Sequence, residues 1–337
     1  MIQHSQCCRL TFVHGNVTKA RDVRFDVARI VATLLIVMCH VPSSPFAVAE
    51  PGCAVQWVRR FFYNPVGALA LFFFLSGYFT PWYTPARKLL LRSLGLFIPY
   101  VVWNTVFIVG VHDELTVSRI YGIGADGLCA DYPLWFVRDL IVMTLMLALL
   151  GRGVWVLTVI SFVFAAVGFC WPTFPGGWIL LPAPSNVFFF SLGASLGSVS
   201  RNTMARAMCW VGGVGCVFGV LSIAGLRVSG NPLLALIPGC IPMACALPVA
   251  RVAEHYRGWV GLLGRSSFLC YCVHAGALIV IGWGVKCVYP PLLEADIVYA
   301  VLPVVIYALC CMGFLFMQRY TPVLLPILAH ERCRKLR

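Results

Sequence analysis

Charged residues are scarce in this sequence, and acidic ones are the scarcest. Only 11% of the 337 residues are charged, whereas soluble domains carry about 25%. Asp and Glu together number 12, against 25 Lys and Arg, and 61% of the residues are hydrophobic. This composition, with a mean hydropathy of +0.89, excludes an ordinary soluble domain and indicates a protein that lies mostly within a lipid bilayer.

Long polar stretches are also missing, which excludes a separate soluble domain of ordinary size. A helix needs about 20 apolar residues to cross a bilayer. The sequence therefore predicts an all-α polytopic membrane protein with about ten transmembrane helices. Its domain covers residues 24–320, between a basic segment at 1–23 and a basic tail at 321–337. The predicted spans are 25–43, 61–80, 89–110, 133–151, 153–170, 184–200, 206–226, 231–251, 265–285 and 296–318.

The basic residues are unevenly distributed over the predicted loops. If the N-terminus is cytoplasmic, most of the 25 Lys and Arg fall on the inner side. The positive-inside rule then predicts that both termini are cytoplasmic, in a multi-pass protein of the inner (cytoplasmic) membrane. A net charge of +13 thus reflects topology, and we expect the bilayer and no nucleic acid as a partner. The outer segments hold only Arg59, Arg60, Arg119, Arg227 and Lys286.

Pairs of CxxC motifs are absent although the chain has 16 cysteines. Most of these cysteines lie in apolar runs, where thiols act as small apolar side chains. We therefore predict no metal site. The segment GIGADG, at residues 122–127, fits GxGxxG, but no strand precedes it, so we interpret it as a turn and not as a dinucleotide site. The segment GASLG, at residues 193–197, predicts a close helix contact.

Ionisable side chains at membrane depth are costly, and each one is a candidate functional residue. In the first predicted span, Arg29 and His40 lie on one helical face, separated by roughly 16 Å along the axis. Asp26 precedes Arg29 by three residues and is expected to pair with it. Arg29 is either functional or a side chain that reaches the inner surface. His40 is either a general base or a satisfied polar residue at a helix end.

Two later spans carry further candidates. Trp135, Arg138 and Asp139 lie at the outer end of the 133–151 span, where Trp135 fits either an aromatic belt or a binding site for the acceptor. Arg138 and Asp139 are adjacent and point about 100° apart on a helix. We expect each to find its partner on another helix. Tyr271 and His274 share one helical face and either support the site or brace the bundle.

Five sequence blocks, in this order, resemble the integral-membrane acyltransferase family 3. The resemblance covers nearly the whole chain and is closest to the branch that consists of the membrane domain alone. The first span also matches the Arg-x10-His pattern of that family, at Arg29 and His40. Each block alone has little specificity, but their common order is specific. The blocks are FFFLSGYFTP (72–81), RKLLLRSLGLFIPYVVWN (87–104), YPLWFVRDL (132–140), NVFFFSLGASLG (186–197) and SSFLCYCVH (266–274).

The resemblance implies an O-acetyltransferase that draws acetyl-CoA from the cytoplasm and acetylates a hydroxyl of an envelope glycan or lipid-linked sugar. His40 would act as the general base, and Arg29 would help to bind coenzyme A. Trp135, Arg138, Asp139, Tyr271 and His274 would contact the acceptor or support the site.

The family often carries an Arg-x-x-Arg pair at the inner end of the third span, where it would bind the phosphates of coenzyme A. Here the first position is Arg92, and the second is Gly95. Arg87 and Lys88, one turn earlier, are the candidates to replace the missing arginine. This departure weakens the assignment of the phosphate site.

Two other classes of protein fit the composition. A transporter or flippase would also have many spans and buried charges, but it would predict paired halves with interrupted helices, and no internal repeat is visible. A non-catalytic scaffold for glycan assembly is the third interpretation.

Overall fold

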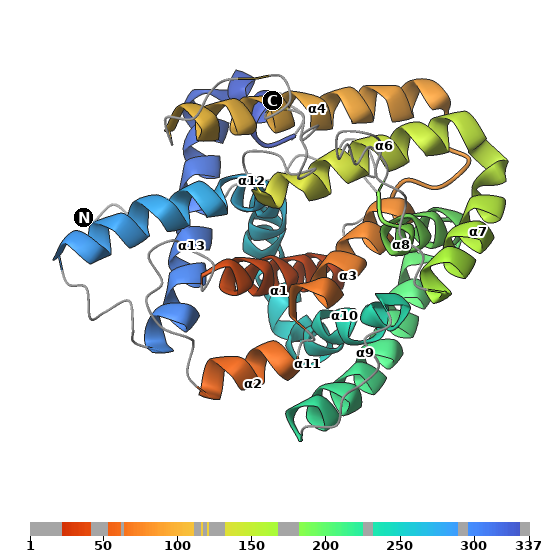
Figure 1. Cartoon of the computed structure of the whole chain (residues 1–337), viewed down its shortest axis with the longest axis horizontal. Helices are drawn as coiled ribbons and strands as arrows, with labels where there is room; N and C mark the ends of the chain where they lie inside the picture. The colour runs from red at the N-terminus through yellow and green to blue at the C-terminus, as the bar shows by residue number, and fades with distance from the viewer. Residues whose placement is uncertain are drawn as a thin grey trace, which may run out of the picture.

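The computed structural model describes residues 22–41, 53–61, 64–110, 116, 120, 132–167, 182–224, 232–288 and 296–330. All regular structure in these ranges is helical (Figure 1), which agrees with the predicted all-α class. The GIGADG segment and the ends of the chain, 1–21 and 331–337, lie outside the described residues.

The helices follow the predicted order. The α-helices are α1 (Val23–His40), α2 (Cys53–Phe61), α3 (Asn64–Tyr78), α4 (Ala86–Gly110), α6 (Trp135–Leu150), α7 (Val154–Ala166), α8 (Pro184–Ser195), α9 (Arg201–Ile223), α10 (Leu236–Gly239), α11 (Ile241–His255), α12 (Arg257–Val288), α13 (Asp296–Tyr320) and α14 (Leu325–Leu328). The short 3₁₀ helices are η1 (Tyr132–Leu134), η2 (Gly151–Gly153), η3 (Pro232–Ala235) and η5 (Pro322–Leu324).

Within the described residues, 5 helical stretches are long and apolar enough to cross a membrane: Ala86–Gly110, Trp135–Ala166, Arg201–Ile223, Arg257–Val288 and Val298–Tyr320. The second of them changes direction at η2, where Gly151 has a positive φ of 50°. Helix α1 has 18 residues, but charges crowd its first half. An all-α membrane protein is thus supported, whereas the count of ten spans and the orientation of the termini remain predictions.

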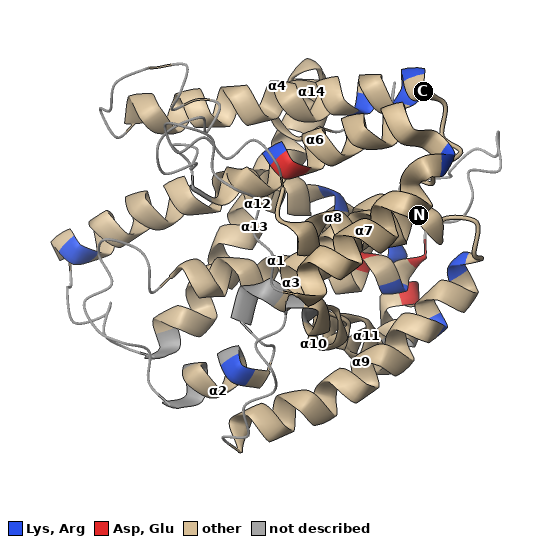
Figure 2. Ribbon diagram, turned by 45° about the vertical axis from the view of Figure 1, so that its right-hand side comes forward, with Lys and Arg blue, Asp and Glu red and all other residues tan. Residues whose placement is uncertain are grey.

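The outer faces of the long helices are apolar, as lipid contact requires. On α9 Trp210 is 80% exposed, and on α4 Leu90, Leu91 and Leu94 are each more than half exposed. Figure 2 shows that long stretches of helix carry no charge and that Lys and Arg lie mainly near helix ends. A surface of this kind is stable against hydrocarbon and not against water.

Some predicted spans have different bounds in the structure. The 231–251 span is broken at Cys240 into α10 and α11, because Pro238 and Pro242 cannot donate the backbone hydrogen bonds of a continuous helix. Helix α8 ends at Ser195, earlier than predicted, whereas α12 begins at Arg257, well before its predicted start.

Helix α1 lies at the centre of the bundle (Figure 1), in contact with α3, α11, α12 and α13. Its buried face includes Phe25, Ala28, Ala32 and Ile36, which belong to the main hydrophobic core. The small alanine side chains allow neighbouring helices to approach closely. The helix that carries Arg29 and His40 is therefore surrounded by other helices and is not at the lipid-facing rim.

Helices α3 and α8 cross at two reciprocal glycines. A Cβ added at Gly77 would collide with the backbone carbonyl oxygen of Phe190, and a Cβ at Gly193 would collide with that of Phe74. The two backbones are thus in direct contact, as the GASLG segment predicts. Because backbone atoms cannot move aside as a flexible side chain can, this crossing requires glycine on both helices.

We expect Gly77→Ala to lower the free energy of unfolding by about 1–3 kcal/mol, because the added methyl group must separate α3 from α8. Gly213→Ala is the matched control, since nothing lies within 4 Å of a Cβ at Gly213 and alanine favours a helix more than glycine does. Thermal unfolding of the detergent-solubilised protein measures both. Equal melting temperatures for Gly77→Ala and the wild type would contradict the close crossing.

Candidate functional site

The predicted pair of Asp26 and Arg29 forms near the start of α1. Nη1 of Arg29 lies 3.7 Å from Oδ1 of Asp26. Asp26 is buried, and its carboxylate packs so closely on α12 that a Cβ at Gly264 would lie 2.9 Å from its Oδ1. The guanidinium of Arg29 lies over the ring of Phe79, at 4.9 Å from the ring centroid. These contacts fix the side chain of Arg29 in one position.

Arg29 opens onto a cavity of about 280 Å³, here named the Arg29 cavity. Helices α3, α4, α6 and α12 supply most of its wall. Two more arginines line it, Arg92 from α4 and Arg265 from α12, together with the predicted residue Tyr271. Three guanidinium groups from three helices therefore border one small space.

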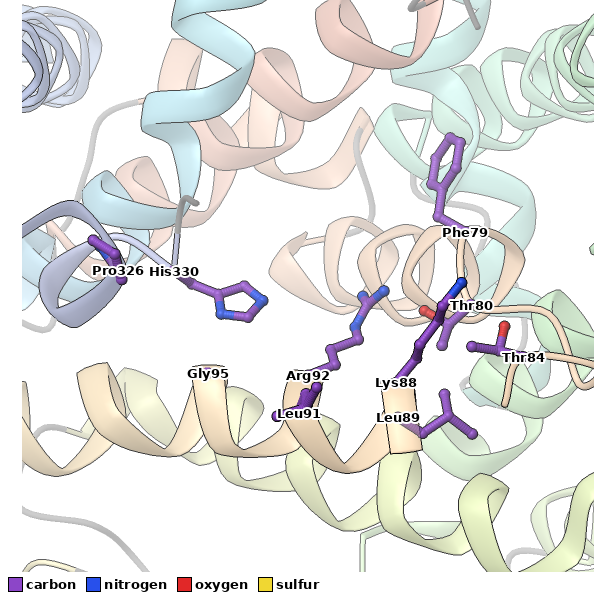
Figure 3. Close-up of a pocket in the computed structure, with 10 residues that line it drawn as sticks. All are labelled: Phe79, Thr80, Thr84, Lys88, Leu89, Leu91, Arg92, Gly95, Pro326 and His330. Carbon is purple, nitrogen blue, oxygen red and sulfur yellow. The ribbon is translucent and has the colours of Figure 1, made fainter. Parts of the chain in front are cut away.

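A second cavity, of about 480 Å³, is named the Lys88 cavity. It lies over the first turns of α4, beside the end of α3 and the segment that follows α13 (Figure 3). Lys88, Arg92 and His330 supply its basic groups, and Thr80 and Thr84 contribute to its wall. Arg92 and His330 also line the Arg29 cavity, so the two spaces adjoin.

The chemistry of the two cavities favours an anionic ligand. No Asp or Glu is among the described residues that line either one. Arg92 is buried, and its Nε has no hydrogen-bond partner in the described part of the chain. A buried guanidinium is costly unless a hydrogen-bond acceptor meets it. Guanidinium groups match the geometry of phosphate and carboxylate oxygens.

His40 ends α1, and its ring lies against the ring of His274 on α12. The two ring centroids are 5.0 Å apart, in an edge-to-face arrangement. Nδ1 of His40 lies 2.7 Å from the carbonyl oxygen of Ile36, and Nδ1 of His274 lies 2.7 Å from that of Tyr271. A carbonyl oxygen only accepts, so Nδ1 carries the proton in each neutral ring and Nε2 carries the lone pair. Each imidazole is thus held in the tautomer in which Nε2 can accept a proton.

Tyr271 connects the Arg29 cavity with the histidine pair. Its ring lines the cavity, and its centroid lies 5.7 Å from that of His274. Its hydroxyl donates to the carbonyl oxygen of Pro133 in η1, which fixes the ring between α12 and the start of α6. Arg29, Tyr271, His274 and His40 therefore form one continuous series along α1 and α12.

We expect Tyr271→Phe to lower stability by about 1 kcal/mol, because the carbonyl of Pro133 loses its donor. The ring remains, so the cavity keeps its shape and a transfer activity should fall by no more than about tenfold. Thermal unfolding and the transfer assay, run on the same preparation, separate the two effects. An inactive variant of normal stability would instead make the hydroxyl group part of the chemistry.

Arg138 and Asp139 form a separate polar cluster. The prediction that they do not pair is wrong, because Nη2 of Arg138 lies 3.4 Å from Oδ1 of Asp139. The flexible arginine side chain bends back towards its neighbour, which the 100° separation of the two Cβ directions did not anticipate. The expected partner on another helix is present for Asp139, since Asn186 of α8 donates to its Oδ2 at 3.3 Å.

The structure does not gather all the predicted residues. Trp135 packs against Phe73, with 6.3 Å between ring centroids, and lines neither cavity. Arg87 is exposed and also lines neither. Sequence reasoning missed Arg265 and His330, because nothing in the local pattern marks them; the one available signal was the missing arginine at Gly95.

No group of three or more His, Cys, Asp or Glu that could hold a metal ion occurs among the described residues. In comparisons with known proteins, no curated protein and no solved structure matches the chain. One family model, described as an acyltransferase domain, matches residues 22–321. This match covers most of the chain and includes both cavities apart from His330 and Pro326, so the protein belongs to acyltransferase family 3 and is a membrane acyltransferase.

Proposed function

We propose that the protein is an O-acetyltransferase that moves an acetyl group from acetyl-CoA to a hydroxyl of an envelope glycan or lipid-linked sugar. The observation that carries the proposal is the pair of adjoining basic cavities that leads, through Tyr271, to the His40 and His274 rings. Coenzyme A has a phosphorylated nucleotide at one end and a thioester on a long arm at the other. A basic site at a distance from a candidate base suits a donor of that shape.

The basic groups would hold the phosphates of the donor. Lys88 and Arg92 line the Lys88 cavity, and Arg29 and Arg265 line the adjoining one. The pantetheine arm would then extend along α1 and α12 towards the histidine pair. The basic end of the bundle is the one that the sequence assigns to the cytoplasm, where acetyl-CoA is available.

His40 would act on the acceptor. Its Nε2 takes the proton of the acceptor hydroxyl while the hydroxyl oxygen attacks the carbonyl carbon of the thioester. The carbon–sulfur bond then breaks, and the coenzyme A thiolate recovers the proton from the imidazolium. The products are an acetyl ester and coenzyme A. His274 would keep the ring of His40 in place from the opposite helix.

The experiment is a transfer assay with the whole chain in lipid vesicles. Acetyl-CoA labelled in the acetyl group is supplied together with an extract of envelope glycans and lipid-linked sugars. We expect label in the glycan fraction and one free thiol released for each acetyl group transferred. Mass spectrometry of glycans from a deletion strain should show the loss of the mass of one acetyl group.

Two results would overturn the proposal. If the thiol is never released and the glycans of the deletion strain are unchanged, the protein does not acetylate them. If a glycan crosses the vesicle membrane in the absence of acetyl-CoA, the transporter interpretation replaces the enzyme.

A further inference from the structure

Gly95 stands where a second arginine is expected, and the structure shows what occupies that space. A Cβ added at Gly95 would lie 2.8 Å from both Cε1 and Nδ1 of His330. Real Cβ contacts of this length are essentially absent, so any other residue at this position would displace the imidazole. In Figure 3 the ring of His330 lies directly over Gly95, next to the side chain of Arg92. The glycine thus makes room for a basic side chain from elsewhere in the chain.

The segment after α13 is folded to present this side chain. It forms η5 and α14, and α14 packs on α4. The indole Nε1–H of Trp103 donates to the carbonyl oxygen of Leu328 at 3.0 Å, which ties the segment down. His330 itself has φ of 50°, the left-handed region that residues with a side chain rarely adopt. This backbone turn directs the imidazole back over α4.

His330 lies at the junction of the two cavities. It lines both of them, as Arg92 does, and its ring centroid is 5.8 Å from that of Phe268 on α12. Lys88 borders the same space from the preceding turns of α4. An imidazole donates a hydrogen bond to a phosphate oxygen in its neutral form and two when protonated. The side chain is therefore suited to an anion held between the two cavities.

We propose that His330 binds a phosphate group of the acyl-CoA donor, and that it replaces the arginine that residue 95 lacks. The proposal rests on the proposed function and assigns part of the donor site to the segment Pro322–His330. An anionic donor would contact Arg92 from α4 and His330 from the folded-back segment at the same time. The donor site would then be complete only when that segment is docked on α4.

The test exchanges the two positions. Four proteins are compared: the wild type, His330→Ala, Gly95→Arg, and the double variant with both changes. Two donors are used, acetyl-CoA and acetyl-pantetheine, which has the thioester arm and no phosphate. For each pair, KM and kcat are measured in vesicles.

We expect His330→Ala to raise KM for acetyl-CoA about tenfold, as for the loss of one charged hydrogen bond. KM for acetyl-pantetheine should not change. Gly95→Arg alone should also bind acetyl-CoA poorly, because its side chain meets the imidazole. The double variant should recover most of the lost affinity, since the new arginine takes the space that the ring vacates.

His255→Ala is the matched control, since His255 is an exposed histidine at the end of α11, outside both cavities. His330→Asn keeps a residue that tolerates the left-handed backbone; it serves if His330→Ala does not fold and should raise KM similarly.

Three outcomes would overturn the assignment of His330. These are an unchanged KM for acetyl-CoA, an equal loss with both donors, and a double variant no better than the worse single one. If the wild type uses no acetyl-CoA at all, the proposed function itself fails. A wild type that uses acetyl-CoA while His330 has no effect refutes only the present inference.

Discussion

His40→Ala is expected to abolish acetyl transfer, with a fall in kcat of about 10²–10⁴-fold, the range typical of a lost general base. The hydroxyl of a sugar is a poor nucleophile until its proton is removed. The bond between Nδ1 of His40 and the carbonyl oxygen of Ile36 leaves Nε2 as the basic nitrogen. Alanine removes that nitrogen and leaves the two cavities intact, so donor binding should persist.

Two measurements distinguish this role from a structural one. Transfer to the glycan is measured at saturating acetyl-CoA, and donor binding is measured separately by equilibrium retention of labelled acetyl-CoA. The control is His255→Ala, which changes a histidine that lines neither cavity. Transfer at the normal rate by His40→Ala would refute the mechanism. Loss of donor binding together with transfer would assign His40 to the binding site.

Arg29→Ala is expected to lower kcat/KM for acetyl-CoA about 100-fold, as when one well-placed donor to a developing or bound charge is removed. The structure adds a second effect. Asp26 is buried, and the substitution removes its partner at 3.7 Å. Removing one member of a buried ion pair typically costs about 3–5 kcal/mol of stability, so this variant should also unfold more easily.

The double variant Asp26→Asn, Arg29→Ala separates the two effects. It removes the stranded carboxylate, so we expect stability to recover while transfer stays low. Arg24→Ala is the control, because Arg24 lies on the same helix and pairs with Asp22 at 2.7 Å but lines neither cavity. Full activity in the stable double variant would show that Arg29 acts only through the fold.

Local geometry accounts for what the sequence predicted well. The i, i+3 pair of Asp26 and Arg29 and the shared face of Tyr271 and His274 follow from the helical repeat alone. The contact between the His40 and His274 rings did not follow, since it depends on how α1 packs against α12. Candidate residues could thus be selected from the sequence, but their pairing across helices required the tertiary structure.

The donor end of the site shows the same limit more clearly. Gly95 looked like a defect, because its neighbours on α4 contain no second arginine. The compensating residue, His330, lies far along the chain, and its position depends on a left-handed turn and on the tie between Trp103 and Leu328. No periodicity predicts such a turn at a histidine. The breaks and lengths of α10, α11 and α12 escaped prediction because proline position and packing, rather than hydropathy, determine them.

Helix α12 is continuous from Arg257 to Val288 and carries both Gly264, against Asp26, and His274, against His40. Because an α-helix rises about 1.5 Å per residue, these two contacts are held roughly 15 Å apart. A rigid separation of this kind selects donors by length. A thioester on a shortened carrier such as N-acetylcysteamine cannot occupy the anion site and reach the histidines at once. A carrier protein with a phosphopantetheine arm would meet the same constraint, with its single phosphate as the only anchor.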